Sequence, residues 1–93
     1  MIDAQEAYRL GLVNYVVPLG EEEAKAKELL AKIATKGPKA IAKVITAVNA
    51  YFADGTDGFQ AEVAAFGEVT LSEDFKEGAQ AFVEKRPAVF TGK

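Results

Sequence analysis

Few side chains in this 93-residue sequence could do chemistry. It contains no histidine and no cysteine. The imidazole base of a Ser-His-Asp triad, a thiolate nucleophile and zinc–thiolate ligation are therefore excluded. Serine occurs once, at Ser72, and no glycine-rich phosphate loop is present. Three adjacent acids, Glu21 to Glu23, are explained by the positive end of a helix dipole. We assign no catalytic residue and no metal ligand within the chain.

Lys85 and Arg86 place two positive charges at the end of the last predicted helix. Cations there complement the helix dipole, but lysine as a point charge and arginine as a fork would also suit a phosphate. Phe66 lies in the middle of the apolar face of the preceding predicted helix, which favours a place in the core. An aromatic ring beside a phosphate-binding lysine would also suit an adenine nucleotide, because base stacking contributes about 1–3 kcal/mol. Spacing alone leaves both interpretations of Phe66 and Lys85 open.

Composition narrows the partners. Eleven basic and fourteen acidic residues give a net charge of −3, whereas a nucleic-acid binder normally carries a basic excess on one face. No apolar stretch approaches the roughly 20 residues that span a bilayer, and the first residues carry acid where a signal peptide carries base. We therefore expect no nucleic acid, no membrane and a cytoplasmic location.

Hydrophobic periodicity predicts a mainly α architecture. A short helix over 4–10 is capped by Asp3, and one strand follows over 12–17, where β-branched and aromatic residues run up to a proline. Four amphipathic helices come next: one from Glu21 to the Gly37-Pro38 break, then about 38–53, 57–71 and 73–85. A single strand has no partner within the chain. It needs a second copy or a sheet outside these residues, which suggests a piece of a larger fold.

The two ends of the chain carry a family resemblance. Residues 1–18 read MIDAQEAYRLGLVNYVVP and residues 72–93 read SEDFKEGAQAFVEKRPAVFTGK. The first run resembles the segment that follows the catalytic core in the enoyl-CoA hydratase/isomerase (crotonase) superfamily, and the second resembles the family's closing segment. The resemblance implies that 1–18 end the crotonase core. It also implies that 19–93 form a C-terminal helical region for oligomerisation and for capping coenzyme A.

The resemblance further implies a parent enoyl-CoA hydratase (3-hydroxyacyl-CoA dehydratase), a lyase of fatty-acid metabolism. Coenzyme A is then part of an acyl-CoA substrate, with no tightly bound cofactor, and the parent is a homo-oligomer, a trimer or hexamer. The family's two catalytic glutamates and its oxyanion-hole amides precede the position of Met1, so these 93 residues alone should be inactive. The positions of Phe66 and Lys85 match family residues at the adenosine end of coenzyme A, the aromatic by adenine and the lysine by the 3′-phosphate.

Other functions stay open. An isomerase, a dehalogenase or a thioester hydrolase of the same superfamily can carry the same tail, because upstream residues set the chemistry. A stand-alone helical interaction protein, descended from such an enzyme, is the alternative from another class.

Overall fold

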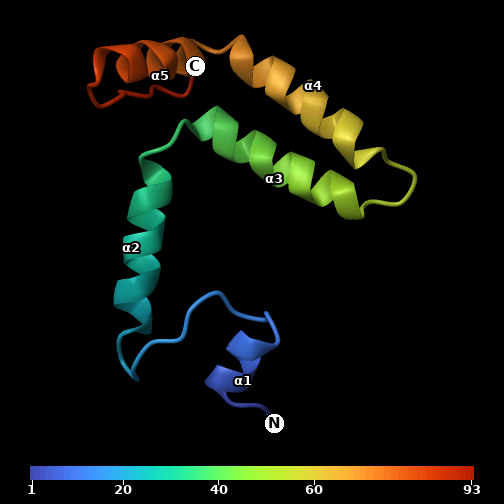
Figure 1. Cartoon of the computed structure of the whole chain (residues 1–93), viewed down its shortest axis with the longest axis vertical. Helices are drawn as coiled ribbons and strands as arrows, with labels where there is room; N and C mark the ends of the chain where they lie inside the picture. Colours follow the sequence, from blue (N-terminus) through green and yellow to red (C-terminus); the bar gives the residue numbers. More distant parts are fainter. The chain divides into compact units, whose positions relative to one another are not determined.

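The computed structural model describes every residue from Met1 to Lys93 and divides the chain into two compact units, residues 1–32 and 33–93. Five helices follow one another along the chain (Figure 1): α1 (Ala4–Arg9), α2 (Glu22–Ala34), α3 (Pro38–Phe52), α4 (Gly58–Thr70) and α5 (Glu73–Glu84). The predicted mainly α architecture is confirmed. None of these helices is long and apolar enough to cross a lipid bilayer.

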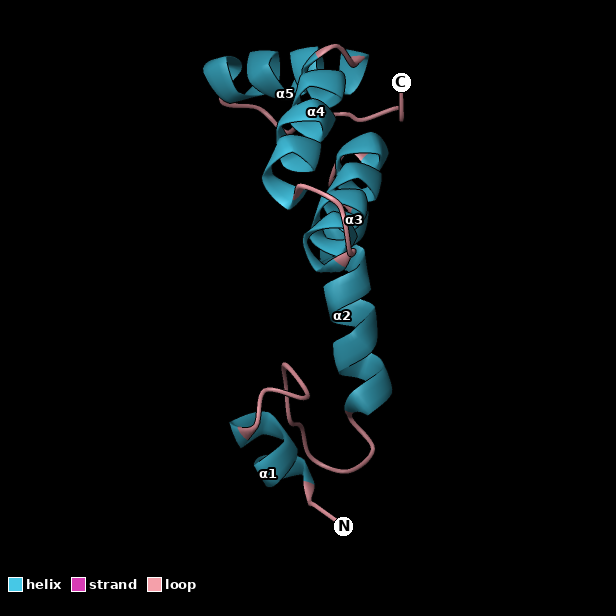
Figure 2. Cartoon of the chain, turned by 90° about the vertical axis from the view of Figure 1, so that its right-hand side faces the viewer, coloured by secondary structure: helices cyan, strands magenta, loops and turns pink.

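The predicted strand over 12–17 is wrong. These residues form irregular chain after α1, and Figure 2 shows only helices and loops. A strand owes its stability to a hydrogen-bond ladder and to cross-strand side-chain pairs. The chain contains no other strand that could provide them. The β-branched and aromatic composition of this segment is therefore not sufficient to make it a strand here.

The first unit begins with a capped helix. The Asp3 carboxylate accepts a hydrogen bond of 2.8 Å from the Glu6 N–H, as predicted for the N-cap of α1. The Glu6 side chain pairs with Arg9 at 2.6 and 2.8 Å, and this contact lowers the pKa of Glu6. Further along, the Lys25 ammonium lies 4.8 Å from the centre of the Tyr15 ring, so a cation–π contact joins the irregular segment to α2.

In the second unit, α3 and α4 form a helical hairpin (Figure 1). The Asp57 carboxylate caps α4 by accepting the N–H groups of Phe59 and Gln60 at 3.1 and 3.2 Å. The Tyr51 ring packs edge-on against Phe59, with ring centroids 6.3 Å apart. Gly58 lies against the Tyr51 backbone: a Cβ added at Gly58 would stand 2.8 Å from the Tyr51 Cα. Gly58 has no positive φ, so glycine is needed there for space and not for conformation.

We expect Gly58→Ala to destabilise the α3–α4 hairpin by about 1–3 kcal/mol, because the added methyl group must push the Tyr51 backbone away. Denaturant unfolding measures the effect. Gly67→Ala in the same helix is the matched control, since a Cβ there meets nothing within 4 Å. It should stabilise α4 by up to about 1 kcal/mol, as alanine does in a helix interior. Equal stability of the two variants would contradict the close approach at Gly58.

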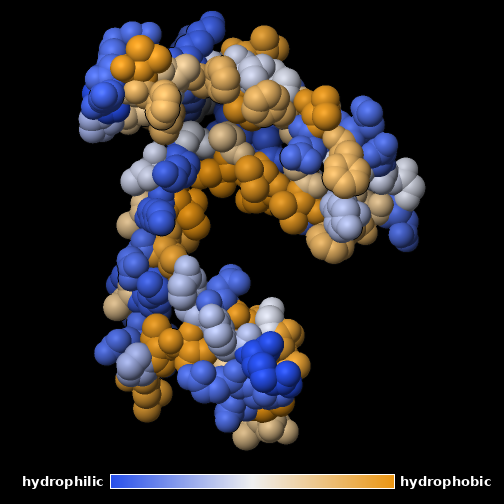
Figure 3. Space-filling model, viewed as in Figure 1, coloured by the Kyte–Doolittle hydropathy of each residue, from blue (hydrophilic) through white to orange (hydrophobic).

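Very little of the chain's apolar surface is buried. Ala65 and Ala81 are the only buried hydrophobic residues, at 8% and 2% exposure. Figure 3 shows hydrophobic residues gathered along α3. The large apolar side chains that stay exposed on α3 and α4 include Val44, Ile45, Val48, Phe52, Phe59, Val63 and Phe66. The helices have the predicted apolar faces, but this chain by itself does not cover them.

Candidate functional site

The C-terminal end of α5 has an unusual backbone. Lys85 follows the helix with φ 54° and ψ 41°, and it is the only non-glycine residue with a positive φ. Its N–H donates to the Phe82 carbonyl at 3.3 Å, and the next N–H, that of Arg86, donates to the Ala81 carbonyl at 3.0 Å. These are the two hydrogen bonds of a Schellman motif, whose left-handed position is usually glycine. A lysine there costs about 1–2 kcal/mol relative to a right-handed conformation, so neighbouring contacts must hold it.

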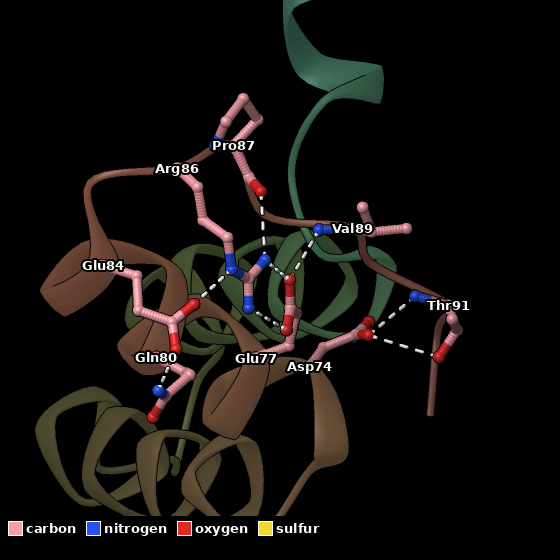
Figure 4. A network of polar contacts seen from close by, with 8 residues as sticks. All are labelled: Asp74, Glu77, Gln80, Glu84, Arg86, Pro87, Val89 and Thr91. Atoms are coloured by element: carbon pink, nitrogen blue, oxygen red, sulfur yellow. Dashed lines mark hydrogen bonds and ion pairs between the residues drawn. The ribbon is translucent and has the colours of Figure 1, made fainter.

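Arg86 makes several of those contacts (Figure 4). Its guanidinium forms a bidentate ion pair with Glu77, at 2.6 and 3.0 Å, and its Nε donates to Glu84 at 2.5 Å. The Pro87 carbonyl accepts a further hydrogen bond of 3.2 Å. All three guanidinium nitrogens thus have partners within the chain. The two cations that close the last helix are therefore not equivalent, and Arg86 has a structural role.

Glu77 also receives a backbone hydrogen bond, from the Val89 N–H at 2.9 Å. The Arg86 guanidinium, and after it this N–H, lower the pKa of Glu77 from 4.5 to about 2. Because the folded-state pKa is lowered, the contribution of Glu77 to folding stability is fully present above about pH 4.5. It is lost as the pH falls through about 2. At neutral pH the ion pair is therefore intact.

Asp74 holds the end of the chain. Its carboxylate is buried and accepts the N–H groups of Thr91 and Gly92 at 2.7 and 2.8 Å, while its own N–H donates to the Lys93 carbonyl at 3.0 Å. Residues 86–93, here called the tail, therefore fold back along α5 (Figure 4). The Phe90 ring packs over Gly78, where an added Cβ would lie 3.4 Å from it. We call the contacts of Asp74 and Glu77 with the tail, the ion pair between Glu77 and Arg86 included, the tail clasp.

The Lys85 ammonium forms no ion pair and no hydrogen bond, in contrast to the Arg86 guanidinium beside it. Phe66, its predicted aromatic companion, is 65% exposed on α4. Phe66 lines the groove between α3 and α4, and Lys85 is not among the residues that line it. Phe82 lies one turn before Lys85 on α5 and is 85% exposed. The structure thus places another exposed aromatic beside Lys85. Phe82 was not predicted as a site residue from the sequence, although it lies only three residues before Lys85.

A groove of about 770 Å³ runs between α3 and α4. Its charged lining residues are Lys43 and Glu62, and Lys43 forms an ion pair with Glu68 across the hairpin. The groove offers apolar contact surface and no facing pair of carboxylates. Its lining is otherwise made of small, aliphatic and aromatic residues: Ala40, Val44, Ala47, Val48, Tyr51, Gly58, Phe59, Val63, Ala65, Phe66 and Val69.

Solved structures that align with this chain define its fold class. Enoyl-CoA hydratase from Bacillus anthracis aligns with a TM-score of 0.88 at 42% identity, over 97% of this chain and 35% of that one. A probable enoyl-CoA hydratase/isomerase from Mycobacterium abscessus aligns with a TM-score of 0.92 at 30% identity, over 99% and 36% of the two chains. The chain is the helical part of a crotonase fold.

The chain belongs to the enoyl-CoA hydratase/isomerase family, whose model matches residues 1–93. Among curated relatives, the crotonyl-CoA hydratase of Syntrophomonas wolfei is 38% identical over the whole chain and 36% of its own length. The short-chain-enoyl-CoA hydratase of Clostridium acetobutylicum is 42% identical over 91% of the chain and 33% of its own length. The 93 residues therefore span about a third of the length of these relatives.

Proposed function

We propose that this chain is the oligomerisation and coenzyme-capping region of an enoyl-CoA hydratase, which adds water to the double bond of a trans-2-enoyl-CoA. The names of the relatives support hydration over the isomerase, dehalogenase and thioester hydrolase alternatives. In this proposal residues 1–18 end the catalytic core and 19–93 form the helical region. The groups that handle water and proton lie outside these 93 residues, so the chain alone does not catalyse the reaction. A cytoplasmic location stays a prediction from composition.

Lys85 carries the coenzyme-binding part of the proposal. Its ammonium is free of internal partners, whereas Arg86 beside it is held by Glu77 and Glu84. A free ammonium on an exposed helix end can pair with a phosphate at no cost to existing contacts. We assign it to the 3′-phosphate of the coenzyme A that forms part of the acyl-CoA substrate.

Two aromatic residues can serve the adenine base in this proposal. Phe66 is the residue that the family resemblance favours, and it lines the α3–α4 groove, whose lining does not include Lys85. In this proposal it meets the Lys85 site through a neighbouring subunit. Phe82 is exposed and lies one turn from Lys85 in the same chain. Stacking on either ring would contribute about 1–3 kcal/mol.

The exposed apolar faces support the oligomeric part of the proposal. Soluble monomers rarely expose large contiguous apolar patches, and here the α3–α4 groove and its rim remain open. We propose that further subunits of the same enzyme, or its catalytic core, cover this surface in a homotrimer or a dimer of trimers.

Lys85→Ala in the intact enzyme tests the coenzyme role. We expect the KM for an enoyl-CoA to rise about 5-fold, the upper range for an exposed charge pair, while the KM for the 3′-dephospho analogue stays unchanged. Lys76→Ala, which removes an exposed lysine from the same helix, is the control and should affect neither substrate. An equal rise in KM for both substrates would show that Lys85 does not bind the 3′-phosphate.

The same assay separates the two aromatics. A pantetheine ester lacks adenine. The variant that loses the stacking ring should therefore raise the KM for both adenine-containing substrates and leave the KM for the pantetheine ester unchanged. Phe66→Ala and Phe82→Ala are compared in this way. If neither variant raises the KM for the adenine-containing substrates more than that for the pantetheine ester, neither ring stacks on the base.

A further inference from the structure

The left-handed backbone at Lys85 is held from both sides. Before it, the Glu84 carboxylate accepts a hydrogen bond from Arg86 Nε at 2.5 Å, and after it Arg86 is anchored to Glu77 by the bidentate pair. The ion pair between Glu84 and Arg86 therefore spans Lys85, and Glu77 ties that pair to the preceding turns of α5. A non-glycine residue in this conformation persists only where its surroundings impose it. We therefore infer that these side chains hold the backbone of Lys85 in the left-handed conformation.

The same contacts also determine which charged groups near Lys85 are paired. Glu77 and Glu84 are acidic neighbours of Lys85 on α5, and Arg86 engages both of them. Neither carboxylate pairs with the Lys85 ammonium. Arg86 thus engages the two acidic residues nearest to Lys85 in the sequence. The Val89 N–H, at 2.9 Å, joins the tail to Glu77.

We propose that Glu77 is a positioning residue for Lys85. By anchoring Arg86 and the tail, Glu77 fixes the left-handed turn in which the Lys85 ammonium stays free to bind the 3′-phosphate of coenzyme A. This inference rests on the proposed function of Lys85. Glu77 itself does not touch the ligand: it acts through the backbone of the turn and through the charge of Arg86.

Glu77→Gln in the intact enzyme tests the proposal because electrostatics and positioning predict opposite results. Removing a negative charge, and releasing Arg86, should by itself favour a nearby phosphate. Loss of positioning should instead weaken the phosphate contact. The measured quantity is the ratio of the KM for the 3′-dephospho substrate to the KM for the complete enoyl-CoA. We expect Glu77→Gln to lower this ratio about 3-fold, while the KM for the dephospho substrate stays near its original value.

Three variants make the result specific. Glu73→Gln removes the same charge from an exposed position of α5 and should leave the ratio unchanged or slightly raised. Arg86→Lys keeps the charge but loses the bidentate pair, so it should lower the ratio as Glu77→Gln does. In a Lys85→Ala background, Glu77→Gln should have no further effect on the ratio. Thermal unfolding of each variant identifies any general loss of folding.

The outcomes separate the two claims. A lowered ratio with Glu77→Gln and Arg86→Lys that disappears in the Lys85→Ala background supports the positioning role. If Lys85→Ala lowers the ratio but Glu77→Gln does not, positioning is overturned and the phosphate role of Lys85 survives. If Lys85→Ala itself leaves the ratio unchanged, the proposed function of Lys85 fails, and the positioning role fails with it. If Glu77→Gln raises the KM for both substrates equally, Glu77 contributes only to folding, and the proposal is also overturned.

Discussion

Val48→Asp should dissociate the intact enzyme into smaller species. Val48 lines the α3–α4 groove and is 54% exposed in this chain. If another subunit covers the groove, as we propose, the substitution buries an unpaired carboxylate in an apolar contact, which costs several kcal/mol. Every 1.4 kcal/mol is a factor of ten in the dissociation constant, so we expect the constant to rise by at least about 100-fold. Sedimentation velocity across a dilution series measures it.

Asn49→Asp is the matched control for Val48→Asp. Asn49 is the next residue on α3, is exposed and lies outside the groove, and the substitution adds the same charge. It should leave the assembly intact. Dissociation by Asn49→Asp as well would attribute the effect to the net charge of the helix. An unchanged assembly with Val48→Asp would show that no subunit contact covers the groove.

The helices could be predicted from the sequence because their signals are local. Asp3, Asp57 and Ser72 are N-caps that accept N–H groups two or three residues on. Such contacts form within one turn and depend on no other part of the fold. The apolar faces follow from periodicity in the same way. What the periodicity did not indicate is that these faces remain uncovered within the chain.

The strand over 12–17 failed for the opposite reason. Its composition favours an extended conformation, but a strand also needs a partner at hydrogen-bonding distance, and the chain has none. The sequence was enough to predict that this segment has no partner strand within the chain. Its irregular conformation in the absence of that partner was not, because β-propensity mainly reflects packing against neighbours.

Of the site around Lys85, the sequence predicts the position of the lysine but not the conformation of its backbone. The lysine itself stands out at a helix end, but its left-handed backbone depends on Arg86 reaching back nine residues to Glu77. Likewise Asp74 meets the tail 17 and 18 residues later, at Thr91 and Gly92. No periodic pattern encodes such contacts, because they form only when the proline-containing tail reverses along α5. Sequence reasoning could therefore find the cation but not the contacts that hold its turn.

Asp74→Ala should release the end of the tail from α5. The buried carboxylate accepts the N–H groups of both Thr91 and Gly92, and hydrogen bonds to a charged acceptor contribute about 1.5–3 kcal/mol. We expect the exchange of these two amide hydrogens with solvent deuterium to quicken by about 10- to 100-fold. The Val89 amide, held by Glu77, should change much less, since its acceptor remains. Hydrogen exchange of the intact protein measures all three amides.

Glu73→Ala is the control for Asp74→Ala, because it removes a neighbouring acid that is exposed in the same helical turn. It loses only a favourable charge at the start of α5, worth about 0.3–1 kcal/mol, and should leave the tail amides protected. If Asp74→Ala also leaves Thr91 and Gly92 protected, other contacts hold the tail. Faster exchange at Val89 to the same degree would mean that the clasp opens as one unit, so that Asp74 and Glu77 hold the turn at Lys85 together.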